Sequence, residues 1–161
     1  MVLTGAAGMW DTGPGSGLEL SNVVLVGSRD IDPDEQELID SGRLRLVKAG
    51  PDLPTRLAEA VRGRTIYIHL DCDVLEPGLV PTEYLSPGGL SLHELHAAFE
   101  VLARQEIVGL EIAEFEATWP NESEPVSPEQ LVDAVLPALV RREGSGAPVS
   151  RHRQTFSRRT V

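Results

Sequence analysis

Short apolar runs rich in β-branched residues alternate with helical patterns along most of the chain. Strands are predicted at 23–27, 44–48, 65–71 and 106–116, and helices at 33–41, 52–62, 92–104 and 127–142. This alternation is typical of parallel strands joined by right-handed helical crossovers, where ligands gather beyond the carboxyl ends of the strands. The sequence therefore predicts an α/β fold with a parallel sheet and helices on both of its faces.

Capping patterns mark where two of these helices begin. Asp32 precedes Pro33, which is the favoured order of an N-cap residue and a first helical residue. Ser91 and Glu94 have the spacing of a capping box, in which each side chain accepts the other residue's backbone N–H. We expect the first and third helices to begin at these positions.

Composition is that of a single globular domain. The chain has 161 residues, of which 41% are hydrophobic, and this is enough for one sizeable core. We expect the domain to cover residues 1–142 and to open with an irregular, glycine-rich lead-in over residues 1–21. Residues 143–161 contain almost nothing apolar to bury, so we expect a disordered basic tail there.

Charge and apolar patterning exclude several classes of partner. Residues 141–161 carry six arginines and one glutamate, a net +5, so the rest of the chain carries −16 toward the total of −11. An acidic body disfavours nucleic acid and suits cations or cationic substrates. No apolar run approaches the roughly 20 residues of a membrane span, and no secretory leader pattern is present. We expect a cytoplasmic protein that binds neither nucleic acid nor membrane.

Two aspartates follow one another at the end of the strand predicted over residues 65–71. Side chains two residues apart on an extended strand point to the same side, so we expect Asp71 and Asp73 to face together and Cys72 to face away. Burying two unpaired carboxylates together is costly, and a divalent cation such as Mg²⁺, Ca²⁺ or Mn²⁺ removes that cost. The alternative is that the pair caps a turn or the start of a helix.

Other candidate ligands are less specific. His69 shares the face of Asp71 by strand parity, either as a ligand or, as we favour, as a hydrogen-bonded histidine in the core or beside the site. His93 and His96 are three residues apart on a predicted helix, which suits a metal pair but is more often a solvated face. Cys72, the single cysteine, is expected to be inert packing rather than a reactive thiol.

Three motifs in order resemble one enzyme family. HLDCDVLEPG at 69–78, PGGLSLHEL at 87–95 and VGLEIAEFE at 108–116 resemble the C-terminal half of the arginase/agmatinase/formiminoglutamase family, the ureohydrolases. A weaker resemblance extends from Asn22 to about Leu139. It implies a three-layer α/β/α domain around a parallel sheet, with the N-terminal part of the fold missing. It also implies a binuclear Mn²⁺ site whose bridging hydroxide attacks a guanidino or formimino carbon.

The resemblance assigns roles to particular positions. Asp71 would bridge both ions, Asp73 would bind one of them, and Glu114 would meet the cationic group of the substrate. Glu76 and Glu111 stand where the family has aspartates, which moves each carboxylate by one methylene. The hydroxyl-bearing residue of the family's substrate loop has no clear match in this sequence. Tyr84 or Ser86 could supply a hydroxyl instead, and we assign the role to neither.

The remaining metal ligands of the family come from a Gly-Gly-Asp-His and an Asp-Ala-His-x-Asp element, and neither occurs here. We therefore expect a fragment, a split gene product or a start codon assigned too late, which binds metal weakly and hydrolyses little alone. An incomplete sheet would leave a raw edge and favour a homo-oligomer.

The resemblance thus implies a hydrolase for a small cationic guanidino or formimino compound. The alternative is a degenerate, non-catalytic relative that persists as a binding or oligomerisation module. A deacetylase of the same broad fold is a third reading, disfavoured because an amide substrate would not need Glu114. The substrate and the preferred metal stay open.

Overall fold

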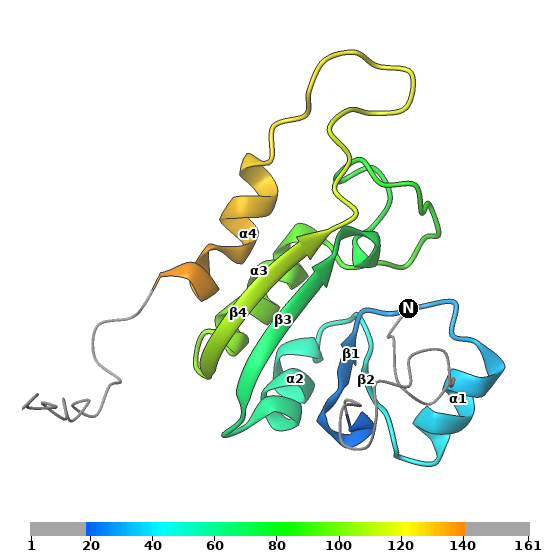
Figure 1. The fold of residues 1–161 in the computed structure, drawn as a ribbon, viewed down its shortest axis with the longest axis vertical. Helices are drawn as coiled ribbons and strands as arrows, with labels where there is room; N and C mark the ends of the chain where they lie inside the picture. Colours follow the sequence, from blue (N-terminus) through cyan, green and yellow to red (C-terminus); the bar gives the residue numbers. More distant parts are fainter. Residues whose placement is uncertain (1–18, 141–161) are drawn as a thin grey trace, which may run out of the picture.

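The structure is a computed structural model, and it describes residues 19–140 of the chain. Its elements in chain order are the 3₁₀ turn η2 (Leu20–Asn22), β1 (Val24–Val26), α1 (Pro33–Asp40), β2 (Arg45–Val47), α2 (Leu53–Val61), β3 (Thr65–Asp71), the 3₁₀ turn η3 (Cys72–Val74), α3 (Leu92–Leu102), β4 (Glu106–Ala113) and α4 (Glu129–Leu139) (Figure 1). Strands and helices alternate as predicted. Most of the expected lead-in and the whole expected basic tail lie outside the described residues.

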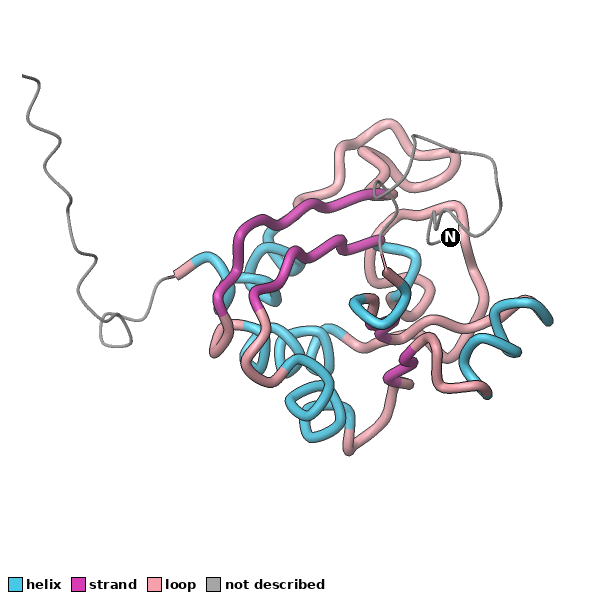
Figure 2. Tube along the Cα trace, turned by 60° about the horizontal axis from the view of Figure 1, so that its bottom comes forward, coloured by secondary structure: helices cyan, strands magenta, loops and turns pink. Residues whose placement is uncertain are grey.

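The strands pair in parallel, as the alternation predicted. β1 pairs with β2, with Val24 opposite Arg45, and β3 pairs with β4, with Thr65 opposite Glu106. These are two separate two-stranded sheets, and no strand within residues 19–140 pairs with both. Figure 2 shows the long β3–β4 pair apart from the short β1–β2 pair. A single continuous sheet is therefore not formed by the described residues, because no ladder of backbone hydrogen bonds joins β1 to β3.

Helices cover one face of the β3–β4 pair within residues 19–140: α3 lies behind the strands in Figure 1, and α4 packs against α3. β3 alternates in burial because successive side chains of a strand point to opposite faces. Ile66, Ile68 and Leu70 pack against the core, whose helical side chains include Leu95, Phe99, Leu131 and Val135. Tyr67 and His69 on the opposite face are exposed. The described part of the chain thus leaves one sheet face open.

Local sequence signals fix most boundaries. The capping box at α3 is confirmed, since the Ser91 hydroxyl accepts the Glu94 N–H at 3.2 Å and the Glu94 carboxylate accepts the Ser91 N–H at 2.9 Å. Asp32 precedes α1 as predicted, but its side chain makes no capping hydrogen bond. α4 begins at Glu129 and ends at Leu139, so it is shorter at both ends than the predicted 127–142. Within residues 19–140, no helix combines the length and hydrophobicity needed to cross a membrane.

β4 ends at Ala113, three residues earlier than predicted. The next residue, Glu114, has a φ of 57°, which lies in the left-handed region that side-chain-bearing residues rarely adopt. This turn of the backbone stops the strand and places Glu114 at its carboxyl end.

Candidate functional site

The carboxyl ends of β1, β3 and β4 meet at one loop, residues 75–90. Leu75 and Leu90 bridge to each other at the two ends of this loop. Gly27, directly after β1, lies against Leu90, since a Cβ on Gly27 would come within 2.9 Å of the Leu90 side chain. The backbone N–H of Glu116, beyond β4, donates to the Pro81 carbonyl at 3.0 Å. This is the edge where the sequence predicted ligands to gather.

Asp71 and Asp73 do not lie on one extended strand. β3 ends at Asp71 and residues 72–74 form η3, so the prediction that strand parity aligns the two side chains is wrong. The Asp71 Oδ1 accepts the backbone N–H of Asp73 at 3.1 Å and thereby caps this turn. The capping role that the sequence left as an alternative is therefore present, and the turn η3, rather than strand geometry, places the Asp73 side chain.

One oxygen of this pair is unsatisfied. The Oδ1 atom of Asp73 is buried and has no hydrogen-bond partner in the part of the chain that the structure describes. A buried carboxylate oxygen without a partner is costly, and a hard divalent cation is a suitable partner for it. Residues 19–140 nevertheless contain no group of three or more His, Cys, Asp or Glu side chains placed to hold a metal ion. Asp71 and Asp73 could thus supply some of the ligands of a cation site, but they do not complete one.

Cys72 lies between Asp71 and Asp73 in the sequence and is buried in the structure. Its side chain is 0% exposed, which confirms the packing role predicted for it. Burial, followed by the negative charges of Asp71, Asp73 and Glu114, raises the pKa of the Cys72 thiol to about 11. Asp71 pairs with Ala113 in the β3–β4 ladder, so Glu114 follows β4 beside the end of β3, where Asp71 and Asp73 lie.

Glu114 itself is exposed at the end of β4. Its left-handed backbone is strained for a residue with a side chain, and strain of this kind is often found at functional sites. The following residue, Phe115, is half-buried and packs on the core, so the turn that displays Glu114 is anchored. An anchored, exposed carboxylate at this edge can receive a cationic group.

Glu76 serves the loop. Its Oε2 accepts the backbone N–H groups of Gly88 and Gly89, each at 2.8 Å. Gly89 approaches Leu75 so closely that a Cβ on it would lie 2.3 Å from the Leu75 carbonyl. The carboxylate of Glu76 therefore holds the end of the loop against its beginning. The predicted position of Glu76 beside the metal ligands stays a prediction.

His69 and Glu111 lie opposite each other on the open face of the β3–β4 pair. The His69 Nδ1 is 3.5 Å from Glu111 Oε1, and the Tyr67 hydroxyl donates to Glu111 Oε2 at 2.9 Å. This hydrogen bond, with smaller contributions from burial and from the Glu111 charge, raises the pKa of Tyr67. Both His69 and Glu111 are about half exposed, at 53% and 52%, so the core placement considered for His69 is wrong.

Arg29 and Asp30, which follow β1 after Gly27 and Ser28, were not among the predicted site residues. The Arg29 guanidinium donates to the Ser86 carbonyl at 2.9 and 2.7 Å and to the Leu75 carbonyl at 3.1 Å. Asp30 accepts the hydroxyl protons of Tyr84 and of Ser86. The signal that could have found them is their place at the carboxyl end of a predicted strand. Since the protons of Tyr84 and Ser86 are used here, neither hydroxyl is free to donate to a ligand.

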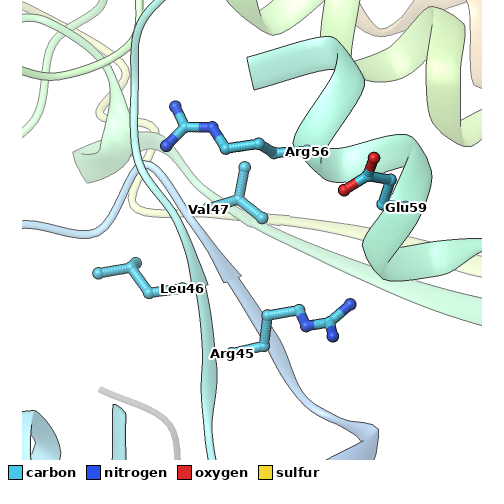
Figure 3. Close-up of a pocket in the computed structure, with 5 residues that line it drawn as sticks. All are labelled: Arg45, Leu46, Val47, Arg56 and Glu59. Atoms are coloured by element: carbon cyan, nitrogen blue, oxygen red, sulfur yellow. The ribbon is translucent and has the colours of Figure 1, made fainter. Parts of the chain in front are cut away.

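Two other features stand apart from this edge. His93 and His96 are both exposed on α3, as expected for a solvated face. A surface hollow of about 310 Å³ lies between β2 and α2, and Figure 3 shows the side chains of Arg45 and Arg56 pointing away from each other there. Arg56 is already bound to Asp52 at 2.9 Å and to the Lys48 carbonyl at 2.9 Å. None of the acids at the strand ends lines this hollow.

The chain is similar to known proteins over most of its length. A family model described as the arginase family matches residues 12–125. An N(omega)-hydroxy-L-arginine amidinohydrolase of Streptomyces lavendulae is 40% identical over 139 residues, which are 86% of this chain and 51% of that protein. Arginase from Bacillus caldovelox matches with a TM-score of 0.58 and 26% identity, over 76% of this chain and 44% of that one. Entamoeba histolytica arginase matches with a TM-score of 0.62 and 19% identity, again over 76% and 44%.

The chain spans about half the length of these relatives. The solved structures nevertheless share its parallel strands and covering helices, which confirms the predicted arginase-like α/β/α fold, of which this chain covers part.

Proposed function

Because the chain belongs to the arginase family, we propose that it is a metal-dependent hydrolase of a C–N bond in a small guanidino or formimino compound. The observation that carries this proposal is the register of β3 and β4, which pairs Asp71 with Ala113 and so brings Glu114 beside the strand end that holds Asp71 and Asp73. Amidine substrates are cationic, so a site rich in carboxylates suits both the metal and the substrate.

Asp71 and Asp73 would hold Mn²⁺ in this proposal. The unpartnered Oδ1 of Asp73 supports the assignment, since it is an oxygen donor that the described residues leave unsatisfied. When bound, Mn²⁺ lowers the pKa of water and stabilises developing negative charge. Two carboxylates are few ligands for such an ion, so we expect this chain to bind Mn²⁺ weakly.

Glu114 would orient the substrate. A carboxylate at the end of β4 can accept charge-assisted hydrogen bonds from a guanidinium or formiminium group, and these fix the position of the central carbon. The left-handed backbone at Glu114 and the packing of Phe115 on the core support a fixed backbone position for this residue.

A binding and turnover experiment tests this function. Mn²⁺ binding would be followed by electron paramagnetic resonance, and product release would be measured with L-arginine, N-hydroxy-L-arginine, agmatine and formiminoglutamate. We expect weak binding and slow Mn²⁺-dependent hydrolysis of at least one compound. Asp71→Asn and Asp73→Asn should each weaken binding about tenfold or more and abolish turnover. Glu114→Gln should leave Mn²⁺ binding unchanged and lower kcat/KM about 10- to 100-fold, because a charge-assisted contact is lost.

Asp133→Asn on α4 is the matched control, since Asp133 is exposed on a helix and should affect neither measurement. Mn²⁺ binding that survives both aspartate substitutions would place the metal elsewhere. Turnover of a substrate by both aspartate variants would contradict the proposed site.

A second candidate is a non-catalytic arginase-like module for binding or oligomerisation. It is favoured by one observation, the absence of a complete metal-ligand cluster within residues 19–140. Mn²⁺-loaded protein that hydrolyses none of the four compounds would select this candidate. The homo-oligomer and the cytoplasmic location inferred from the sequence stay predictions under either function.

A further inference from the structure

We infer that Arg29 and Asp30 are positioning residues, which hold the loop 75–90 in place beside Asp73 and Glu114. The contact itself is independent of any activity, whereas its effect on substrate binding rests on the proposed function. Glu76 closes the base of this loop from within its own sequence, whereas Tyr84 and Ser86 are held by residues that follow a different strand, β1.

Arg29 makes the first half of this contact, here called the clamp, which consists of Arg29, Asp30, Tyr84 and Ser86. Its Nε and Nη2 both donate to the Ser86 carbonyl, at 2.9 and 2.7 Å, across 57 residues of sequence. Nη2 also donates to Leu75 at 3.1 Å, so one guanidinium joins the beginning and the end of the loop. The guanidinium carbon lies 4.8 Å from the centre of the Tyr84 ring, which is a cation–π distance.

Asp30 makes the second half of the clamp. Its Oδ2 accepts the hydroxyl protons of Tyr84 and of Ser86, the latter at 2.8 Å. These two hydrogen bonds, and the nearby positive charge of Arg29, lower the pKa of Asp30. Asp30 has a φ of 54°, so its backbone adopts the rare left-handed conformation while its side chain meets the loop. A strained backbone persists when surrounding contacts determine it, and the clamp supplies such contacts.

The loop held by the clamp reaches both sides of the proposed site. It starts within a few residues of Asp73, and the Pro81 carbonyl accepts the N–H of Glu116, two residues beyond Glu114. Pro81 and Thr82 are buried, whereas Leu85, near the tip of the loop, is 63% exposed. The base of the loop is therefore packed, and the clamp fixes the exposed part, which is free to contact the body of a substrate.

Hydrogen–deuterium exchange of the intact chain tests the clamp directly. Tyr84→Phe removes only the hydroxyl, and Arg29→Lys keeps the charge but removes the planar fork of donors. We expect each change to raise exchange of the amides in 82–90 about fivefold or more, since each removes hydrogen bonds that order the loop. Circular dichroism of each variant establishes that it is folded, and Tyr84→Phe alone decides the matter if Arg29→Lys does not fold.

Tyr67→Phe is the matched control, because Tyr67 also donates its hydroxyl to a carboxylate, that of Glu111, but on the open sheet face. It should leave exchange in 82–90 unchanged. Unaltered exchange in the Tyr84→Phe protein would overturn the inference, and so would an equal rise in the Tyr67→Phe protein.

Turnover kinetics separate positioning from plain stability. With a substrate found in the panel above, Tyr84→Phe should raise KM about fivefold or more and change kcat less than about twofold, because the loop meets the substrate away from the reacting carbon. A lowered kcat with unchanged KM would contradict the role. If the unmodified protein turns over nothing, the proposed function fails, and the exchange experiment still decides whether the clamp exists.

Discussion

Cys72 is a buried thiol next to the acidic residues at the end of β3. Its neighbours in sequence are the two aspartates, and the strand-end turn η3 buries the thiol while the carboxylates stay at the edge. Glu114 joins them from β4, and its charge contributes to the raised pKa of the thiol. A protonated, enclosed thiol has no nucleophilic role here, so the function proposed above assigns the chemistry at these strand ends to the carboxylates.

We predict that Cys72 is unreactive in the folded protein. A thiol that is 0% exposed cannot meet a disulfide reagent without local unfolding. Ellman's reagent should leave the native protein unlabelled over a time in which the denatured protein reacts fully, and the single cysteine makes the signal unambiguous. Rapid, complete labelling of the folded protein would show that η3 is open, contrary to the structure.

The helix α3 depends on an acid that acts at two places. Glu94 Oε2 accepts the N–H and the hydroxyl of Ser91, at 2.9 and 2.7 Å, and completes the capping box. Its Oε1 accepts the N–H of Gly50 at 2.9 Å, just before α2. These hydrogen bonds, foremost those from Ser91, lower the pKa of Glu94. A motif that the sequence shows as a local cap therefore also joins the starts of two helices.

We predict that Glu94→Ala lowers the free energy of unfolding by about 2 kcal/mol, because it leaves the backbone N–H groups of Ser91 and Gly50 and the Ser91 hydroxyl without their charged acceptor. Since the folded-state pKa of Glu94 is depressed, its contribution is present above the unfolded pKa of about 4.3 and is lost as pH falls through the lower folded value. Urea denaturation at pH 7 and at low pH measures both effects. The difference in unfolding free energy between the unmodified protein and Glu94→Ala should become smaller in acid. Glu100→Ala, an exposed glutamate on the same helix, is the control. An equal loss in both variants would remove the special role of Glu94.

At the scale of the whole molecule, the described residues leave apolar surface uncovered. Tyr67 and Val108 on the β3–β4 pair are 61% and 65% exposed, and neither outer edge of this pair is occupied by a further strand within residues 19–140. α4 buries Leu131 and Val135 and also exposes an apolar stripe, of which Val132 is part. Unpaired strand edges and exposed apolar side chains both favour association.

We predict that the protein associates with itself through the β3–β4 pair. Sedimentation velocity should show a mass that rises with concentration, and Val108→Lys should reduce the association because a charge on an edge strand opposes further pairing. Val132→Lys places the same charge on α4 and should have the smaller effect. A monomer at every concentration, or a larger effect of Val132→Lys, would contradict this route.

The sequence predicted the local structure well because its signals act within a few residues. β3 occupies the predicted 65–71, and the capping box at Ser91 and Glu94 forms as expected. The errors lie where the chain leaves regular structure. Strand parity was applied to Asp73, which lies beyond the end of β3 in the turn η3. β4 was predicted to continue past Glu114, where the left-handed backbone ends the strand. Periodicity carries no signal for such backbone turns, because they depend on contacts made after the strand has ended.

By itself, the sequence determined the elements, their alternation and the acids at the strand ends, since each rests on propensity, capping or spacing along the chain. Tertiary structure alone decided that Arg29 meets Ser86, that Glu76 closes its own loop and that His69 stands on an open face. These outcomes depend on which strand ends become neighbours in space. Contacts across 57 residues, such as that of Arg29, have no counterpart in local pattern, because only packing brings their partners together.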